Sequence, residues 1–204
     1  MKILLTTIAC SLIIGCSSTS KTPLPRAQNI DLQEFMGDWY VIANKPTFLE
    51  KNAYNALESY SMNDDGTIST TFSFNKNGFD GERVFYHPKG FVNYDDNSEW
   101  GMQFIWPIKA EFIIAYLSPD YQQTIIARSS RDYVWIMSRT PDISDDDYNR
   151  LIDLCVEMGY EKKDIRKIPH QYSSPTLIEA ILPNIKYERK TYQSFIVKSG
   201  NYLL

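Results

Sequence analysis

Few residues of this chain could carry out covalent or metal chemistry. Its histidines and cysteines are His87, His170, Cys10, Cys16 and Cys155. No serine–histidine–aspartate or cysteine–histidine group can be assembled from them, and they supply too few ligands for a metal site. The acidic run at 145–147 lacks the other ligands of a calcium-binding loop, so the start of a helix explains it better. The sequence therefore predicts a protein that is not an enzyme and that uses neither a metal nor a cofactor.

The chain begins with a short apolar segment that ends at a cysteine. The run from Ile3 to Ile14 is too short to span a bilayer, which takes about 20 residues, and is typical of a secretory signal peptide. The motif Ile13-Ile14-Gly15-Cys16 resembles a bacterial lipobox, in which cleavage leaves the cysteine as a new, acylated N-terminus. We therefore expect a lipoprotein signal peptide at 1–15 and lipidation at Cys16. An ordinary signal peptide with an incidental cysteine is the alternative.

Residues 16–29 are rich in serine, threonine and proline, and we expect them to form a polar tether. Ser17 follows the cysteine where an aspartate would favour retention on an inner membrane, so we expect the periplasmic face of an outer membrane. Acyl chains would be the anchor to that membrane. The net charge is −4 and no block of basic residues exists, which argues against nucleic acid as a partner.

The body of the chain fits one strand-rich domain. Aromatic residues make up 14% of the 204 residues, which favours strands. Cys155 is the one cysteine of the body, which excludes a disulfide framework. We expect its side chain to be a small buried hydrophobe. The segments with strand character are 38–45, 54–62, 67–75, 82–94 (broken near His87-Pro88), 99–106, 110–117, 122–130 and 132–139. Turn residues such as Asn63–Gly66 and Asn77-Gly78 separate them. Such serial hairpins predict a meander that closes on itself, because closure removes the exposed edges.

Three ordered motifs accompany these strands. Gly37-Asp38-Trp39 begins the first strand, Ser118-Pro119-Asp120-Tyr121 forms a hairpin turn, and Arg139 ends the last strand. Arg139 could stack on a tryptophan ring while its donors bond to carbonyls. In order and spacing these motifs resemble the lipocalin family. The runs 107–117 and 131–141 are similar to the bacterial outer-membrane lipocalins of the Blc group.

The resemblance covers residues 30–171 and implies an all-β fold. This fold is an eight-stranded antiparallel up-and-down β-barrel with one C-terminal helix packed outside it. The sequence predicts that helix between the N-cap Ser144 and Gly159, with an acidic first turn and one apolar stripe. Apolar residues at 32–36 would close the base of the barrel, and the connection 46–52 would form a lid over its open end.

Alternation along the strands predicts which side chains point into the barrel. From the pattern alone the interior set is Val41, Ala43, Trp100, Met102, Phe104, Trp106, Phe112, Ile114, Tyr116, Tyr133, Trp135 and Met137. The second strand is ambiguous by pattern. Matching its turn to the second hairpin of the family places Glu58 and Tyr60 inside, and the same matching places Phe72 inside.

An eight-stranded barrel is just wide enough for one ligand. An interior lined with rings favours a long acyl chain, because each buried methylene contributes about 0.8 kcal/mol. The alternative is that the rings fill the barrel as a core. A carboxylate at Glu58 must be paired, hydrated or protonated. Near the mouth it could meet the cationic head group of a lysophospholipid, or it could be a rim residue with no ligand role.

The resemblance implies a carrier of fatty acids or lysophospholipids that serves membrane maintenance, and it also implies self-association as a homodimer. A second hypothesis is an assembly lipoprotein with a filled barrel, in which the extension 172–204 binds a protein partner. That extension could be a strand, a tail or a partner-binding segment, and its sequence does not choose between them. A lipid hydrolase or isomerase is disfavoured, since the catalytic groups are missing.

Overall fold

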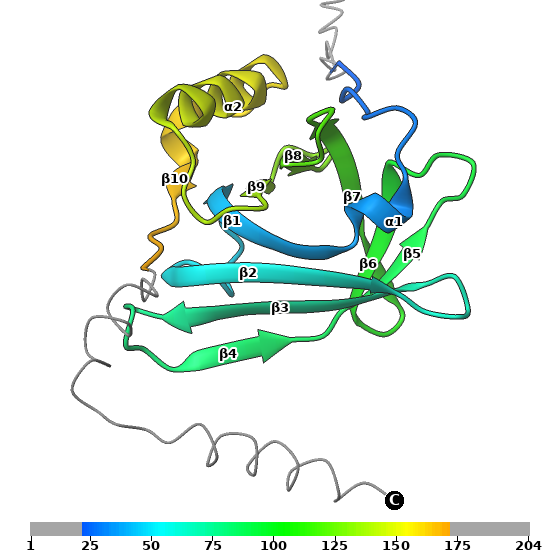
Figure 1. The fold of residues 1–204 in the computed structure, drawn as a ribbon, viewed down its shortest axis with the longest axis horizontal. Coiled ribbons are helices and arrows are strands. Elements are labelled where there is room, and N and C mark those ends of the chain that lie inside the picture. The colour runs from blue at the N-terminus through cyan, green and yellow to red at the C-terminus, as the bar shows by residue number, and fades with distance from the viewer. Residues whose placement is uncertain (1–21, 172–204) are drawn as a thin grey trace, which may run out of the picture.

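The computed structural model describes residues 22–171, whose strands form one closed antiparallel sheet (Figure 1). Most strands adjacent in sequence pair in hairpins, and β1 also pairs with β9, which closes the ring. The predicted eight-stranded barrel is therefore confirmed. The predicted signal peptide, the lipidation site at Cys16 and the extension 172–204 lie outside the described residues.

The element boundaries follow the sequence pattern closely. The strands are β1 (Gly37–Lys45), β2 (Ala53–Met62), β3 (Ile68–Lys76), β4 (Arg83–Tyr86), β5 (Lys89–Val92), β6 (Glu99–Ile105), β7 (Ile108–Leu117), β8 (Gln123–Ala127), β9 (Val134–Ser138) and β10 (Arg166–Lys167). The helices are α1 (Leu32–Phe35), α2 (Asp145–Glu157) and the short 3₁₀ turn η1 (Lys162–Asp164). β4 and β5 both pair with β3 and form one barrel strand, broken at His87-Pro88 as predicted. The two-residue strand β10, which pairs with β1, was not predicted.

One end of the barrel is closed by α1 and the first motif, and we call it the base. Phe35 and Trp39 are 0% exposed, and the Trp39 indole donates to the Phe35 carbonyl at 2.9 Å. The Arg139 guanidinium carbon lies 3.8 Å from the centre of the Trp39 ring. Its nitrogens donate to the carbonyls of Glu34 (2.7 Å), Phe35 (3.1 Å), Asp38 (2.8 Å) and Tyr121 (3.3 Å). The predicted cation–π contact and its carbonyl partners are confirmed.

Gly37, with φ +93°, adopts the left-handed conformation that starts β1 beside this arginine.

The predicted turn before β8 is also part of the base. The Asp120 carboxylate accepts from the Ser118 hydroxyl at 2.6 Å and from the Gln122 amide at 3.2 Å. The Tyr121 hydroxyl accepts from the Asp31 amide at 2.9 Å, which ties the turn to α1.

Apolar side chains form two cores, one inside the barrel and one between its outer face and α2. In β1, Val41 belongs to the inner core but Ala43 to the outer one, because the register with β9 shifts between them. In β7, Ile114 is inner whereas Ala115 and Tyr116 are outer, because the register with β8 shifts there. A β-bulge adds one residue and reverses the alternation beyond it. The predicted inward positions of Ala43 and Tyr116 are therefore wrong.

The predicted helix is confirmed as α2, which lies outside the ring of strands (Figure 1). The Ser144 hydroxyl caps it by accepting from the Asp147 amide at 3.1 Å, and Gly159, at φ +93°, follows its end. Cys155 is 0% exposed in the outer core, as a small buried hydrophobe should be. Between residues 22 and 171, no helix has the length and apolarity needed to cross a bilayer.

The connections of an antiparallel meander alternate between the two ends of the barrel. α1 and the turns after β2, β5 and β7 lie at the base. The connections 46–52, 77–82, 106–107 and 128–133 lie at the opposite end, which we call the mouth.

Residues 22–31, which we call the N-terminal strap, lie outside the ring of strands and lead into α1 (Figure 1). The Thr22 carbonyl accepts from the guanidinium of Arg131, in the mouth connection 128–133. Farther along, the Ala27 amide donates to the Ile114 carbonyl at 2.9 Å.

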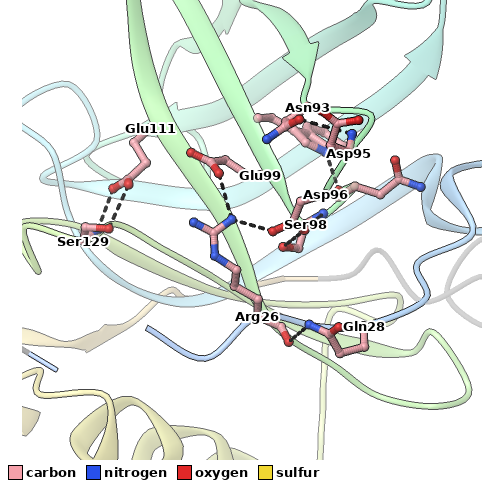
Figure 2. Close-up of polar contacts among 11 residues, drawn as sticks. Arg26, Gln28, Asn93, Asp95, Asp96, Ser98, Glu99, Glu111 and Ser129 are labelled. Carbon is pink, nitrogen blue, oxygen red and sulfur yellow. Dashed lines mark hydrogen bonds and ion pairs between the residues drawn. The ribbon is translucent and has the colours of Figure 1, made fainter. Parts of the chain in front are cut away.

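Arg26 fixes the middle of this strap to the sheet. Its guanidinium lies 2.7 Å from the Asp96 carboxylate and 2.8 Å from the Glu99 carboxylate, as Figure 2 shows. Asp96 belongs to the turn after β5, so the strap has reached the base end of the sheet at Arg26, after its contact with a mouth connection at Thr22.

Candidate functional site

The mouth half of the barrel encloses a cavity of about 270 Å³. Its lining consists of Thr47, Phe48, Leu49, Glu50, Glu58, Phe72, Met102, Phe104, Ile105, Ala110, Glu111, Phe112, Arg128, Tyr133 and Trp135. Most of these side chains are apolar. Phe104 is 50% exposed and Ile105 73% exposed, so the cavity opens to the surface at the mouth. Hollows of about 400 and 420 Å³ lie on the outer surface, beside the strap and beside β10, away from the predicted ligand-binding residues.

The base half of the barrel is filled with packed rings. The Trp100 and Phe112 rings stack with their centres 5.0 Å apart, and the Tyr60 ring meets Trp100 edge-on at 5.7 Å. Phe35 packs on Trp100 from below at 5.5 Å. Aromatic pairs of this geometry make a firm floor for the cavity.

The structure brings most of the predicted ligand-binding residues to the cavity. Glu58, Phe72, Phe104, Phe112, Tyr133 and Trp135 line it. Tyr60 and Ile114 point inward, as predicted, but they are buried in the core rather than in the cavity wall.

Trp106 and Tyr116 were predicted inside the barrel and lie outside it. Trp106 is 82% exposed, because β6 ends at Ile105 and its register with β7 shifts after Met102. Alternation holds only along regularly paired strands, so it fails at that tip. Tyr116 lies beyond the bulge in β7, and its hydroxyl accepts from the Arg150 guanidinium of α2 at 3.0 Å.

Glu58 lies deep in the cavity rather than near the mouth, where the head-group hypothesis had placed it. It pairs across the strands with Trp39 of the base, and it is only 9% exposed. The Tyr60 hydroxyl donates to its carboxylate. Burial raises the pKa of Glu58 to about 7, an effect that the Tyr60 hydrogen bond opposes and the nearby charge of Glu50 reinforces. The same burial raises the pKa of Tyr60 well above its usual value.

Glu50 is a cavity residue that the sequence analysis did not identify. It belongs to the connection 46–52 and is 2% exposed. Its carboxylate accepts from the Trp135 indole, with both oxygens at 3.2 Å, and from the Thr47 amide at 3.1 Å. Burial raises its pKa, and the hydrogen bonds lower it in part. No periodic pattern marks a loop residue, so only the polar side chain within an apolar lid could have suggested it.

The cavity thus combines an apolar wall with two buried carboxyl groups. Among residues 22–171 neither Glu50 nor Glu58 forms an ion pair with a lysine or an arginine. Two like charges near each other in a low-dielectric site favour protonation of at least one of them. The same part of the chain holds no cluster of three or more histidine, cysteine, aspartate or glutamate side chains suited to a metal ion.

Comparison with known proteins agrees with this geometry. The family described as the Lipocalin-like domain matches residues 30–170. Temperature-induced lipocalin-1 of Arabidopsis thaliana is 31% identical over 169 residues, which cover 77% of this chain and 88% of the plant protein. The outer membrane lipoprotein Blc of Escherichia coli K12 is 27% identical over 158 residues, which cover 75% and 87%.

Solved structures share the fold at low identity. Apocrustacyanin C1 aligns with a TM-score of 0.58 at 12% identity, over 78% of this chain and 97% of that chain. The cockroach allergen Per a 4 aligns with a TM-score of 0.55 at 18% identity, over 75% and 96%. Members of the matched family are generally proteins that bind small hydrophobic ligands. The confirmed barrel, its base motifs and these relatives together show that the chain belongs to the lipocalin family.

Proposed function

We propose that this protein binds and carries a single-chain lipid, a fatty acid or a lysophospholipid, and that it is not an enzyme. The observation that carries the proposal is the apolar cavity that opens at the mouth of the barrel. Its volume of about 270 Å³ lies just below the range of ligand pockets, which is about 300–1,000 Å³. A long acyl chain would therefore fill the cavity and extend through the mouth.

The buried carboxyl group of Glu58 decides which end of the lipid enters first. An anionic head group at the floor would meet Glu58 in a site with little solvent, where like charges repel strongly. The hydrocarbon tail therefore enters first, and the head group stays at the mouth. A zwitterionic lysophospholipid satisfies this arrangement as well as a fatty acid does.

Lipidation at Cys16 would hold the carrier on the outer membrane, at its periplasmic face. Two observations support this: the lipobox-like motif, and the relatives named outer membrane lipoprotein Blc. Membrane maintenance would then follow from moving single-chain lipids, which accumulate when phospholipids are damaged.

Lipid analysis tests the proposal directly. The lipidated protein, purified from bacterial membranes, should release fatty acid or lysophospholipid that mass spectrometry identifies. In a titration with a fluorescent fatty acid, Trp135→Ala should weaken binding about tenfold or more, because it removes part of the cavity wall. Tyr116→Ala is the matched control, since this ring lies outside the barrel and its loss should leave the affinity within about twofold.

The competing function is an assembly lipoprotein whose residues 172–204 bind a protein. A protein that releases no lipid, binds no fatty acid and loses a copurifying protein when 172–204 are deleted would favour it. The hollow mouth half of the barrel counts against this alternative, because a pure scaffold needs no cavity.

A further inference from the structure

The mouth of the barrel carries an exposed apolar surface that the cavity alone does not explain. Its members, which we call the mouth patch, are Phe48 (80% exposed), Ile105 (73%), Trp106 (82%) and Ile108 (70%). Phe48 and Ile105 also line the cavity, so the patch forms the rim of its opening. Exposed apolar side chains that gather in this way mark an interaction surface rather than a random feature of the fold.

The β6–β7 hairpin projects the patch beyond the rest of the barrel. β7 pairs with β6 from Ile108 onward, but it pairs with β8 only from Ile113 onward. Every residue from 104 to 109 is exposed. This stretch contains Lys109 and no acidic residue. An apolar tip with a tryptophan and a flanking lysine suits the boundary between lipid head groups and acyl chains.

The path of the strap places the same end of the barrel next to the membrane. The Thr22 carbonyl accepts from Arg131 in a mouth connection, so the described part of the chain begins beside the mouth. Five residues separate Cys16 from Thr22, and an extended chain over that distance spans at most about 20 Å. If Cys16 carries the lipid anchor, as proposed above, the mouth cannot lie far from the bilayer surface.

We propose that the mouth patch docks onto the membrane in which the Cys16 anchor is embedded, so that the cavity opens directly onto the bilayer. A lipid could then pass between membrane and cavity without exposing its tail to water. This inference goes beyond lipid binding, because it assigns an orientation and a second membrane contact. The position of the strap, the projecting hairpin and the shared rim of patch and cavity favour a bilayer as the occupant.

Two other occupants are possible at this end of the barrel, and the test separates them. One is the segment 172–204, because the described chain ends at the mouth end of β2, where the Gln171 amide donates to the Asn55 side chain at 2.8 Å. A second copy of the chain could also bury the patch.

Trp106 reports directly on membrane contact. Lipidated, full-length protein is reconstituted into vesicles of phosphatidylethanolamine and phosphatidylglycerol, with or without brominated acyl chains, which quench indole fluorescence on contact. The difference between the wild-type protein and Trp106→Phe isolates the signal of Trp106. We expect brominated lipid to remove more than about half of that signal, as for an indole at the interface.

A second measurement links docking to lipid transfer. Replacement of both Trp106 and Ile108 by serine should slow the uptake of a fluorescent lysophospholipid from vesicles about tenfold. The affinity for a water-soluble fluorescent fatty acid should not change, because neither side chain lines the cavity. Val156→Ser, which removes an apolar side chain that is 43% exposed on α2, is the control and should alter neither quantity.

The outcomes are distinguishable. An unquenched Trp106 overturns the docking proposal. If deletion of 172–204 then restores quenching, that segment covers the patch; if chemical cross-linking instead traps dimers through the mouth, a second copy does. Failure of the proposed function looks different: the wild-type protein would take up no lipid and bind no fatty acid, whatever the quenching of Trp106.

Discussion

Protonation of Glu58 should control lipid affinity near neutral pH. This carboxyl group lies at the floor of an apolar cavity, and burial raises its pKa to about 7. An acyl tail that enters the cavity displaces whatever water remains there, which disfavours the ionised form further. The tail should therefore bind mainly to the protein in which Glu58 is protonated.

The magnitude follows from the protonated fraction. With a pKa of about 7, about nine-tenths of the Glu58 carboxyls are protonated at pH 6 and about one-tenth at pH 8. The apparent dissociation constant is the intrinsic one divided by that fraction. Affinity should thus fall about tenfold from pH 6 to pH 8, which corresponds to about 1.4 kcal/mol.

The assay is a titration with a fluorescent lysophosphatidylcholine at pH 6, 7 and 8, because the charge of this head group does not change in that range. Glu58→Gln should bind with the same affinity at each pH, close to that of the wild-type protein at pH 6. Glu157→Gln, an exposed position on α2, should keep the wild-type pH dependence. A wild-type affinity that is flat, or that rises with pH as a contact between the Glu58 carboxylate and a cationic head group requires, would refute this reasoning.

Three further predictions concern stability and reactivity. Because the folded pKa of Glu58, about 7, exceeds the unfolded value of 4.5, its contribution to stability is complete below the unfolded pKa and is lost as the pH rises through 7. Glu58→Gln should therefore stabilise the empty protein at pH 8 by up to about 3 kcal/mol in urea unfolding, and an unchanged midpoint would contradict this. Arg139→Lys should lower the free energy of unfolding by about 2–3 kcal/mol, because lysine cannot bridge the carbonyls of the base while stacking on Trp39; a loss below about 0.5 kcal/mol would argue against that role. Cys155 is 0% exposed and burial raises its thiol pKa to about 12, so a thiol reagent should label it only as fast as the protein unfolds, and prompt labelling in native buffer would show that α2 opens by itself.

Features that depend on local pattern were predictable from the sequence. Strand and turn residues gave the meander, and the capping serine and apolar stripe gave α2. The base was predictable for a different reason: Arg139 and Trp39 are distant in sequence but form a recurrent motif of the lipocalin family. In each case the sequence signal lies in residue types at a fixed spacing.

The wrong predictions of inward-facing side chains came from places where residue spacing does not determine which face of the sheet a side chain occupies. A bulge leaves no mark in composition, yet it moved Tyr116 and Ala43 from the predicted inner face to the outer one. Trp106 has the same parity as the cavity residue Phe104, but the strand ends before it. Glu50 belongs to a loop without periodicity, so only tertiary packing brings it to Trp135.

The barrel is packed solid toward the base and hollow toward the mouth, and this division has a consequence for engineering. Trp39 and Trp100 are fully buried and do not line the cavity, whereas Leu49, Phe72 and Met102 do line it. Phe72 and Met102 also belong to the inner core, and Leu49 does not. Substitutions of wall residues outside that core, such as Leu49, should therefore leave most of the melting temperature intact. At such positions, ligand selectivity could be redesigned with little change in thermal stability.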